Sequence, residues 1–448
     1  MTGLSGRGPL IELMNAPMRY AWGGHGQIRA LLGTGGALIE PDGPGALEAE
    51  LWFGAHPAGP TRVAQPDLIG GAANLAEWID ADPGSALGEL SDGIRGEGAR
   101  LPYIMKVLSA REPLSLQAHP TLDEAREGFA RENAAGIALD DPQRNFKDPW
   151  HKPELILALT PTIEAVCGFR DLAEVRGLVA GITDLLAQDG HADAGFSAFA
   201  EMVAGVHDAG SLRELVAWIL RDRDHDGIRV PAREDPQIAA AVQAVHAWAN
   251  SPEAAAEDTT RQARNVRRLE KFFPGDPGVL LILLLNHVSI PRGQAVFVRA
   301  GTLHSYMEGL GIEIMAASDN VLRGGITPKH IDVDELLKAL VFAPVPDPIL
   351  PAHQLADGST LLAPGIPDFQ LRRITADDGA ARQVEVDGAT PTIALCLSGS
   401  ARVTGRLTGG ELTAGHAVYL RPGEGAVTLE GAFDVVLASP GSPQVDGM

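Results

Sequence analysis

The chain is poor in cysteine and has no long hydrophobic segment, and both absences restrict what it can be. Its 448 residues include only two cysteines, Cys167 and Cys396, which lie far apart and outside any Cys-x-x-Cys pair. This usage argues against a disulfide framework and a thiolate metal site, and it is typical of the reducing cytoplasm. The longest strongly apolar run, residues 279–285, is far too short to cross a bilayer.

The chain also lacks an obvious signal peptide and an excess of positive charge. Its first residues contain no basic stretch followed by a long apolar core, so we expect no secretory leader. Acidic residues outnumber basic ones by 58 to 36, which gives a formal net charge of −22. This excess argues against nucleic acid and anionic membranes as partners. An anionic small molecule would need a local positive site.

The pattern of the sequence predicts a mainly β protein with a helical insertion. Apolar residues recur at three- and four-residue spacing from Leu172 to Leu186, and Asp235-Pro236 is typical of a helix start. The run 279–285 is expected to return the chain to strand, and short Gly-punctuated strands of jelly-roll type are expected near the C-terminus. We therefore predict a β domain assembled from residues 1–170 and 266–345, a helical domain over 171–265, and a jelly-roll domain over 346–448.

Two segments offer candidate metal ligands, each with an ordinary alternative. Gln117 and His119 are two residues apart, so on a strand both side chains point to one face and can approach one ion. The same spacing also fits a plain polar strand face. Glu154 precedes a run that is expected to form a buried strand, where a carboxylate is costly without a cation or metal. A salt bridge between Lys152 and Glu154 would satisfy it equally.

A third segment adds His304. Gly293, Arg299-Ala300-Gly301 and His304 are spaced as in the second signature of the cupin superfamily, with Arg299 where proline is usual. We expect a tight turn at Gly301 and a strand that begins by pointing His304 into a barrel. A hydrogen-bonded core histidine is the alternative. As a set, two imidazoles and two oxygen donors suit zinc in an open, catalytic site; the four residues are Gln117, His119, Glu154 and His304.

A fourth segment, residues 309–337, combines charged side chains with a Gly-Gly pair and a Thr-Pro turn. Its charged residues include Glu313, Asp319, Arg323 and Lys329. A guanidinium and an ammonium near Gly-rich backbone are suited to holding a phosphate. A solvated surface loop is the alternative.

Six motifs in order resemble the type I phosphomannose isomerase (mannose-6-phosphate isomerase) family of the cupin superfamily. They are YAWGG, AELWFGAHPAGP, MKVLSAREPLSLQAHP, HKPELILALTP, LLLNHVSIPRGQAVFVRAGTLHSYMEG and IEIMAASDNVLRGGITPKHIDVDELL. The resemblance implies a catalytic cupin barrel, a helical domain and a C-terminal jelly roll. Asp148-Pro149-Trp150 stands where the family often has a small residue and Asn, so that loop is expected to differ.

The resemblance also implies roles for single residues. It places one zinc ion per chain on Gln117, His119, Glu154 and His304. Lys106 and Ser115 match positions linked with the substrate phosphate, and Lys329 and Tyr306 match other substrate contacts. The implied catalytic group comprises Arg323, Glu313, Lys152, His151 and Asp319.

The implied reaction interconverts mannose 6-phosphate and fructose 6-phosphate by moving a proton between C1 and C2 through a cis-enediol. This chemistry needs a base that also acts as an acid, and positive charge near the two oxygens. Glu313, Asp319, Lys152 and Lys329 are the candidates for the proton shuttle, and a carboxylate working with Lys152 is the preferred hypothesis. His151 is expected to help open the sugar ring.

Two other functions stay open at this point. One is a cupin that binds a sugar phosphate without turning it over, and the other is a metal-dependent cupin oxygenase. The retained ligands argue against the first, and Gln117 in place of a histidine argues against the second. We expect a cytoplasmic enzyme, a monomer or weak homodimer, that serves GDP-mannose synthesis or mannose use. His56, His287 and His330 are expected to be packing or supporting residues.

Overall fold

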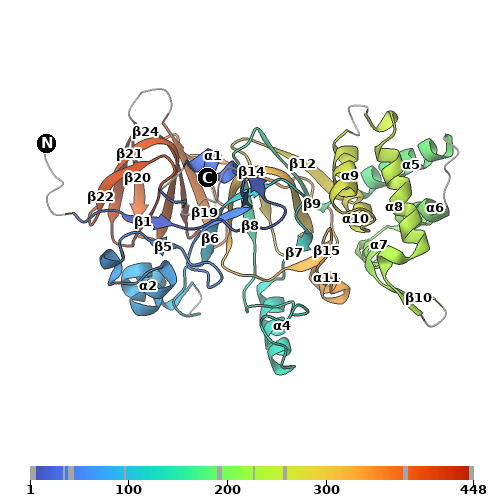
Figure 1. Cartoon of the computed structure of the whole chain (residues 1–448), viewed down its shortest axis with the longest axis horizontal. Coiled ribbons are helices and arrows are strands. Elements are labelled where there is room, and N and C mark those ends of the chain that lie inside the picture. The colour runs from blue at the N-terminus through green and yellow to red at the C-terminus, as the bar shows by residue number, and fades with distance from the viewer. Residues whose placement is uncertain are drawn as a thin grey trace.

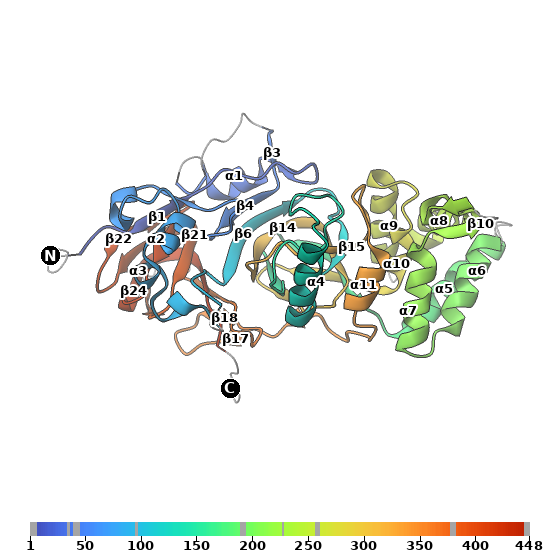
Figure 2. The same cartoon turned by 90° about the horizontal axis from the view of Figure 1, so that it is seen from below.

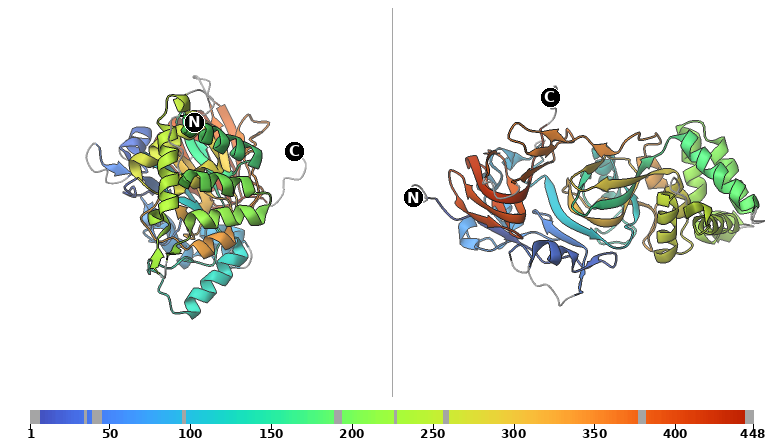
Figure 3. Two further views of the ribbon diagram at one scale, coloured as in Figure 1. Left: turned by 90° about the vertical axis from the view of Figure 1, so that its right-hand side faces the viewer. Right: turned by 90° about the horizontal axis from the view of Figure 1, so that it is seen from above.

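The structure is a computed structural model of the 448-residue chain, and three parts lie in a row along its long axis (Figure 1). A sheet with the C-terminal strands forms one end, a second sheet lies in the middle, and a block of helices forms the other end (Figures 2 and 3). The described residues are 7–33, 36–38, 45–94, 97–188, 194–225, 228–255, 260–376 and 382–442. None of the helices described is both long and apolar enough to span a bilayer.

The middle sheet has ten strands, arranged around the long strand β14. One part of β14 pairs with β6 and β8, and the other part pairs with β7 and β9, so four strands meet on this one. The strands are β4 Glu50–Phe53, β6 Tyr103–Ala110, β7 Leu116–Ala118, β8 Glu154–Ala158, β9 Thr162–Phe169, β12 Leu285–Pro291, β13 Ala295–Val298, β14 His304–Ala316, β15 Leu322–Gly325 and β16 Ile349–Leu350.

The second ten-stranded sheet is built mainly from the C-terminal part of the chain. It contains β17 His353–Gln354, β18 Thr360–Leu362, β19 Gln370–Thr375, β20 Arg382–Gly388, β21 Thr392–Thr404, β22 Gly409–Thr413, β23 Ala417–Leu420 and β24 Gly425–Ser439. Two N-terminal strands, β1 Ile11–Met14 and β5 Arg62–Val63, complete it, because β1 pairs with both β23 and β5. The predicted domain boundaries stay a prediction. The pairing of β1 shows that the N-terminal segment crosses between the two β parts.

Short strand pairs and helices fill the remaining chain. The strand pairs are β2 Gly24–His25 with β3 Leu47–Glu48, and β10 Arg223–His225 with β11 Ile228–Val230. Outside the helical block lie α1 Gln27–Leu32, α2 Leu75–Ala81, α3 Pro83–Leu87, α4 Leu122–Ala134 and α11 Val333–Ala339, with 3-10 turns at Pro66–Ile69 and Gly88–Asp92. The helical block contains α5 Leu172–Gln188, α6 Ala194–Gly205, α7 Ala209–Leu220, α8 Pro236–Ala249, α9 Thr260–Phe272 and α10 Gly278–Leu283, with 3-10 turns at Ala232–Glu234 and Glu253–Ala255.

The fold is mainly β with a helical part, as predicted, and Asp235 caps α8 as expected through two backbone N–H groups. The expectation of a strand at 279–285 is wrong for most of that run, because Gly278–Leu283 is helix α10 and β12 begins only at Leu285. A short, continuous apolar run does not distinguish a buried strand from a buried helix. Asp276 supports the helix start, since its carboxylate accepts the Gly278 N–H at 2.7 Å.

Apolar clusters join the middle sheet to both of its neighbours, the C-terminal sheet and the helical block. One apolar cluster joins side chains of both sheets, among them Leu157 and Leu371. Tyr103 of the middle sheet is fully buried and donates its hydroxyl to the carbonyl of Ala438 in β24 at 2.8 Å. Another cluster joins the helical block to Leu116 and Leu303 of the middle sheet. The middle sheet is therefore supported from both ends.

Candidate functional site

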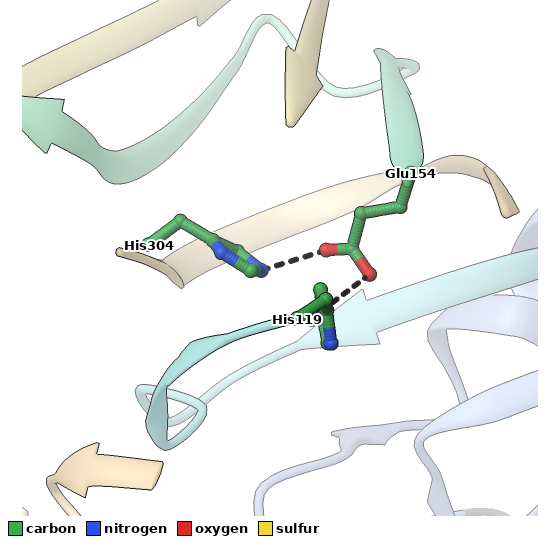
Figure 4. Close-up of side chains that lie close together, drawn as sticks. All are labelled: His119, Glu154 and His304. Carbon is green, nitrogen blue, oxygen red and sulfur yellow. Dashed lines mark ion pairs between the residues drawn. The ribbon is translucent and has the colours of Figure 1, made fainter. Parts of the chain in front are cut away.

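Three buried side chains from separate segments meet inside the middle sheet. His119 follows β7, Glu154 begins β8 and His304 begins β14 (Figure 4). Glu154 Oε2 lies 3.2 Å from His119 Nε2, and Glu154 Oε1 lies 2.8 Å from His304 Nε2. One ligand atom from each residue lies within 4.8 Å of the others, so the cluster has the size of a metal site.

Hydrogen bonds on the far side of each ring orient the two histidines. His119 Nδ1 lies 2.7 Å from the Asn320 carbonyl, and His304 Nδ1 lies 3.0 Å from the Thr302 carbonyl. Because a carbonyl only accepts, each Nδ1 carries the proton and each Nε2 keeps a lone pair. Those lone pairs face the carboxylate of Glu154, and His304 Nε2 has no hydrogen-bond donor among the described residues. Acceptors that face each other in a buried site fit a bound cation.

The turn before β14 explains why His304 enters the site. Gly301 has φ +76°, and a Cβ there would lie 2.7 Å from the Ala339 carbonyl oxygen. Only glycine combines this backbone with such a close approach. β13 ends at Val298 and β14 starts at His304, which is the strand–turn–strand arrangement expected from the Gly293 to His304 spacing.

Gln117 lies in the same cross-strand row as His304. Strand β7 pairs Gln117 with His304 on one side and with Arg323 on the other. Residues directly opposite each other in an antiparallel pair share one face of the sheet. Gln117 is therefore beside the cluster, with the neutral oxygen donor that the predicted ligand set requires.

Lys152 brings a positive charge into the cluster. Its ammonium lies 3.0 Å from Glu154 Oε2 and 3.5 Å from His119 Nε2. Burial, together with the Lys152 charge, lowers the pKa of His119 to about 4. Burial opposes ionisation of Glu154, but the Lys152 ammonium and the adjacent histidine rings hold its pKa well below the usual range. The salt bridge between Lys152 and Glu154, posed as the alternative to a metal ligand, exists alongside the histidine cluster.

A second buried group of charges lies next to the first. Lys106 of β6 is directly opposite Glu313 of β14, with 3.2 Å between ammonium and carboxylate. Glu50 of β4 lies 3.5 Å from the same ammonium and accepts the Trp52 indole N–H at 2.6 Å. Burial raises the pKa of Glu313 to about 7, and the nearby Glu154 charge adds to this rise while Lys106 opposes it.

A β-bulge in β14 allows this one strand to contribute side chains to both buried groups. The register of β14 against β9 shifts between Tyr306 and Glu308. Without an extra residue, alternation would send even- and odd-numbered side chains to opposite faces. The bulge allows Tyr306 and Glu313 to reach the same interior, where Tyr306 donates its hydroxyl to Glu154 at 3.1 Å. Tyr306 is buried and Ser115 is half-buried, and their predicted roles as substrate contacts stay predictions.

The other predicted catalytic residues lie at the edge of this interior. The Asp319 carboxylate lies 3.4 Å from His56 Nε2 and its side chain is 41% exposed, far more than that of Glu313. His151 is half-buried and places Nε2 3.0 Å from the buried carboxylate of Asp368, which comes from the C-terminal part.

Arg323 and Lys329 are cations without a carboxylate partner in the described part of the chain. Arg323 is half-buried on β15, and burial lowers the pKa of its guanidinium. Lys329 is exposed; partial burial lowers its pKa and Arg323 lowers it further. Lys329 also lines a cavity of about 660 Å³ between the helical block and the loop after β15.

Sequence reasoning missed Glu50 and Asp148 as members of the site. Glu50 stands in the AELWFGAHPAGP motif, whose alternation would have shown only a strand with one polar position. Its contact with Lys106 depends on the pairing of β4 with β6, which no local pattern gives. Asp148 is noted above only as part of a divergent loop, yet its carboxylate binds the backbone of Asp319.

Three comparisons with known proteins agree with this geometry. A family model described as "Phosphomannose isomerase type I, catalytic domain" matches residues 10–172. The chain is similar to the mannose-6-phosphate isomerase of Escherichia coli (strain K12), at 33% identity over 94% of this chain and 97% of that protein. It is also similar to the mannose-6-phosphate isomerase of Emericella nidulans, at 30% identity over 88% of this chain and 87% of that protein.

The solved structures give the same result. The mannose 6-phosphate isomerase from Salmonella typhimurium, bound to substrate (fructose 6-phosphate) and zinc, matches with a TM-score of 0.79 and 29% identity. The match covers 97% of this chain and 100% of that one. The likeness therefore includes the two β parts and the helical block.

Proposed function

Because this chain belongs to the mannose-6-phosphate isomerase family, we propose that it interconverts D-mannose 6-phosphate and D-fructose 6-phosphate in the interior around Glu154. The observation that carries the proposal is the position of two buried groups next to each other. The His119–Glu154–His304 cluster offers metal ligands, and the adjacent Glu313 offers a carboxyl with a pKa of about 7. An aldose–ketose exchange needs such an acid–base group, and a metal ion is one way to supply positive charge near the two reacting oxygens.

The proposed cofactor is one zinc ion, held by His119, Glu154 and His304 with Gln117 as the fourth ligand. The donor set suits zinc, because it contains imidazole nitrogens and oxygens and leaves room for an outside ligand. When bound, zinc supplies a Lewis acid that polarises the oxygens of the reacting carbons.

Glu313 is the proposed proton shuttle. In the direction from mannose to fructose phosphate, its carboxylate takes the proton from C2 of the open chain, the hydroxyl proton of O2 passes to O1, and the resulting carboxylic acid returns a proton to C1. A pKa near the working pH serves both steps, since the group must first accept and then donate. Asp319 is the weaker candidate, because its side chain is 41% exposed. Lys152, which contacts both Glu154 and His119, adds positive charge near the enediol oxygens.

His151 is the proposed ring-opening group. Its contact with the buried carboxylate of Asp368 fixes the ring and supports a proton on Nε2. With Nε2 held in this way, the opposite ring nitrogen, Nδ1, can move a proton to or from the ring oxygen of the sugar.

Arg323 and Lys329 are the proposed phosphate contacts. Lys106 is less suited than the sequence indicated, because Glu50 and Glu313 already neutralise its ammonium. Arg323 and Lys329 pair with no carboxylate among the described residues, and a phosphate would supply the missing negative charge.

The test is a coupled assay of mannose 6-phosphate turnover on protein as purified, after chelation, and after zinc is restored. We expect activity that disappears with the metal and returns with zinc. Saturable sugar-phosphate binding without turnover in the zinc-loaded protein would instead assign the chain to silent binding proteins. Oxygen uptake by an iron-loaded sample would assign it to the oxygenases.

We also propose that the enzyme works in the cytoplasm as a monomer or weak homodimer. Light scattering across a hundredfold range of protein concentration would separate these two states from a stable oligomer.

A further inference from the structure

Two loops lie against each other beside the metal cluster, and the carboxylate of Asp148 joins them. Asp148 Oδ1 accepts the hydroxyl of Ser318 at 2.8 Å and the backbone N–H of Trp150 at 3.0 Å. Asp148 Oδ2 accepts the backbone N–H of Asp319 at 2.8 Å. One carboxylate therefore holds its own loop, residues 147–150, to the loop formed by residues 318–320.

The side-chain amide of Asn320 completes the connection from the opposite direction. Its Oδ1 accepts the Lys147 N–H at 2.7 Å, and its Nδ2 donates to the carbonyls of Asp148 at 2.7 Å and Trp150 at 2.8 Å. Asn320 and Ser318 are both fully buried. A buried polar network of this kind has its donors and acceptors matched, so it fixes one arrangement of the two loops.

This arrangement reaches the metal cluster through one carbonyl. The backbone oxygen of Asn320 accepts the Nδ1–H of His119 at 2.7 Å. That contact selects the tautomer and the ring orientation that leave His119 Nε2 facing Glu154. The loop that carries Asp148 also continues directly into Lys152 and Glu154.

We propose that Asp148 is a positioning residue for metal binding, which acts by fixing the Asn320 carbonyl that orients His119. The inference rests on the proposed zinc site and adds a residue that touches neither metal nor substrate. It assigns a function to the contact between the two loops, where the alternative is that the contact only stabilises the fold.

The chemistry of the contact requires a carboxylate. Asp148 faces four donors, because Asn320 Nδ2 also lies 3.3 Å from Oδ1. An asparagine at this position would turn its own NH₂ group toward at least one backbone N–H in either orientation. Asp148→Asn therefore keeps the volume of the side chain and disturbs the position of the Asn320 carbonyl.

Glu424 provides a matched control. It is a fully buried carboxylate that also accepts two backbone N–H groups and one hydroxyl, from Leu407 at 2.8 Å and from Thr408 at 3.1 and 2.8 Å. It lies in the C-terminal part, beside β22 and β24. Glu424→Gln removes the buried charge without contact to the loops at the metal cluster, and should lower the stability less than Asp148→Asn because its amide oxygen can still accept both backbone N–H groups.

The experiment measures zinc affinity by competition with a chromogenic chelator, together with Tm, for the parent, Asp148→Asn, Asp148→Ala and Glu424→Gln. We expect the Asp148 variants to bind zinc about 10- to 100-fold more weakly, the loss seen when outer partners of metal ligands are removed. Glu424→Gln should stay within twofold of the parent despite a lower Tm. Co²⁺-loaded Asp148→Asn should also show a visible absorption spectrum different from that of the Co²⁺-loaded parent.

Asp148 variants with parental zinc affinity and a parental Co²⁺ spectrum would overturn the inference. If Asp148→Ala does not fold, Asp148→Asn and the milder Ser318→Ala form the series, with the smaller loss expected for Ser318→Ala. A parent that binds zinc but does not turn over mannose 6-phosphate contradicts the proposed function alone. A parent that binds no zinc overturns the metal site and this inference together.

Discussion

At the scale of single residues, burial separates the two carboxylates that could move a proton. The Glu313 side chain is 5% exposed and has Lys106 as its partner, whereas that of Asp319 is 41% exposed. Burial raises the pKa of Glu313 to about 7, so this carboxyl can both accept and donate a proton near neutral pH. The more enclosed group is thus also the better matched to neutral pH.

Glu313→Gln should lower kcat by at least about 100-fold, the usual contribution of a positioned acid–base group. A protonated Glu313 cannot accept the C2 proton, so kcat/KM of the parent should fall as the pH drops through the pKa of this carboxyl. The pKa of about 7 is that of Glu313 in the metal-free chain, and a divalent cation bound nearby lowers this pKa. Stopped assays from pH 5 to 9 would measure this acid limb.

The matched variant for that assay is Asp319→Asn, which should retain the acid limb of the parent. Zinc content of both variants should equal that of the parent, while Glu313→Gln should have a lower Tm because Lys106 loses one of its two carboxylate partners. Retention of most turnover by Glu313→Gln would remove this residue from the proton path.

The site residues differ in how far sequence could predict them. Gln117, His119 and His304 stand in motifs whose spacing carries a structural meaning, and Glu154 precedes a buried strand. The family resemblance then identified the four as one predicted ligand set. Glu50 was missed because its partner Lys106 lies 56 positions away and only the pairing of β4 with β6 joins them. Long-range pairing of this kind leaves no periodic signal in the sequence.

At the scale of elements, Asp276 shows how one polar residue can favour a helix over a strand at the start of α10. The Leu-rich run could pack as strand or helix, but Asp276 accepts N–H groups from Gly278 and from Ile326, at 2.7 and 3.0 Å. Ile326 has φ +56°, a costly conformation for a β-branched residue. The same carboxylate therefore starts a helix and holds the strained start of the loop that leads to Lys329.

Asp276→Ala should destabilise the protein by about 2 to 4 kcal/mol, because it leaves two largely buried N–H groups unpaired. It should also raise KM more than it lowers kcat, since Lys329 follows Ile326 by three positions. Urea denaturation and steady-state kinetics would measure the two effects. Asp208→Ala, which removes the exposed cap of α7, should cost about 1 kcal/mol and leave KM unchanged.

His287 joins three elements as a buried neutral ring. Asn265 of α9 donates to its Nδ1 at 2.9 Å, and its Nε2–H donates to the Ile282 carbonyl of α10 at 2.9 Å. Burial lowers the pKa of His287 to about 3, despite the opposing effect of the Ile282 hydrogen bond. The unfolded chain gains a proton there near pH 6.5, while the folded chain gains it only near pH 3.

The free energy of unfolding should therefore be fully retained above about pH 6.5 and fall toward pH 3, by up to about 1.4 kcal/mol per pH unit from this group. His287→Gln keeps one acceptor and one donor without titrating, so its stability should fall less steeply. Urea unfolding of both proteins at pH 7.5, 6.0 and 5.0 gives the difference. Equal slopes would show that His287 does not contribute.

At the scale of the whole molecule, the three parts depend on one another. β1 and β5 come from the N-terminal segment but lie in the C-terminal sheet. Tyr103 donates its hydroxyl to the Ala438 carbonyl, and Tyr419 donates its hydroxyl to the Ala86 carbonyl. Composition and local pattern predicted the order of β and helical parts, because each part has its own periodicity. They could not predict the shared strands, because an N-terminal strand has the same local signal whichever sheet it joins.

The overall negative charge of the chain also repels the proposed anionic substrate. A net charge of −22 repels a sugar phosphate at long range, and Arg323 with Lys329 attracts it only at short range. Salt screens over about 8 to 10 Å near physiological ionic strength, so it weakens long-range repulsion more than it weakens a contact inside the site. The two effects can be separated by varying salt.

Arg323→Ala should lower kcat/KM for mannose 6-phosphate at least tenfold at about 20 mM salt, since charge-assisted contacts with phosphate are strong. The kcat/KM of the variant should rise with salt relative to that of the parent, because only Lys329 then opposes the repulsion by the acidic surface. The ratio of parent kcat/KM to variant kcat/KM should fall several-fold at about 300 mM salt, because the attraction by Arg323 is partly screened as well. A ratio that is small at low salt, or that grows with salt, would show that the phosphate is held elsewhere. Arg402→Ala in the C-terminal sheet, which removes an exposed arginine paired with Glu411, should follow the parent at every salt concentration.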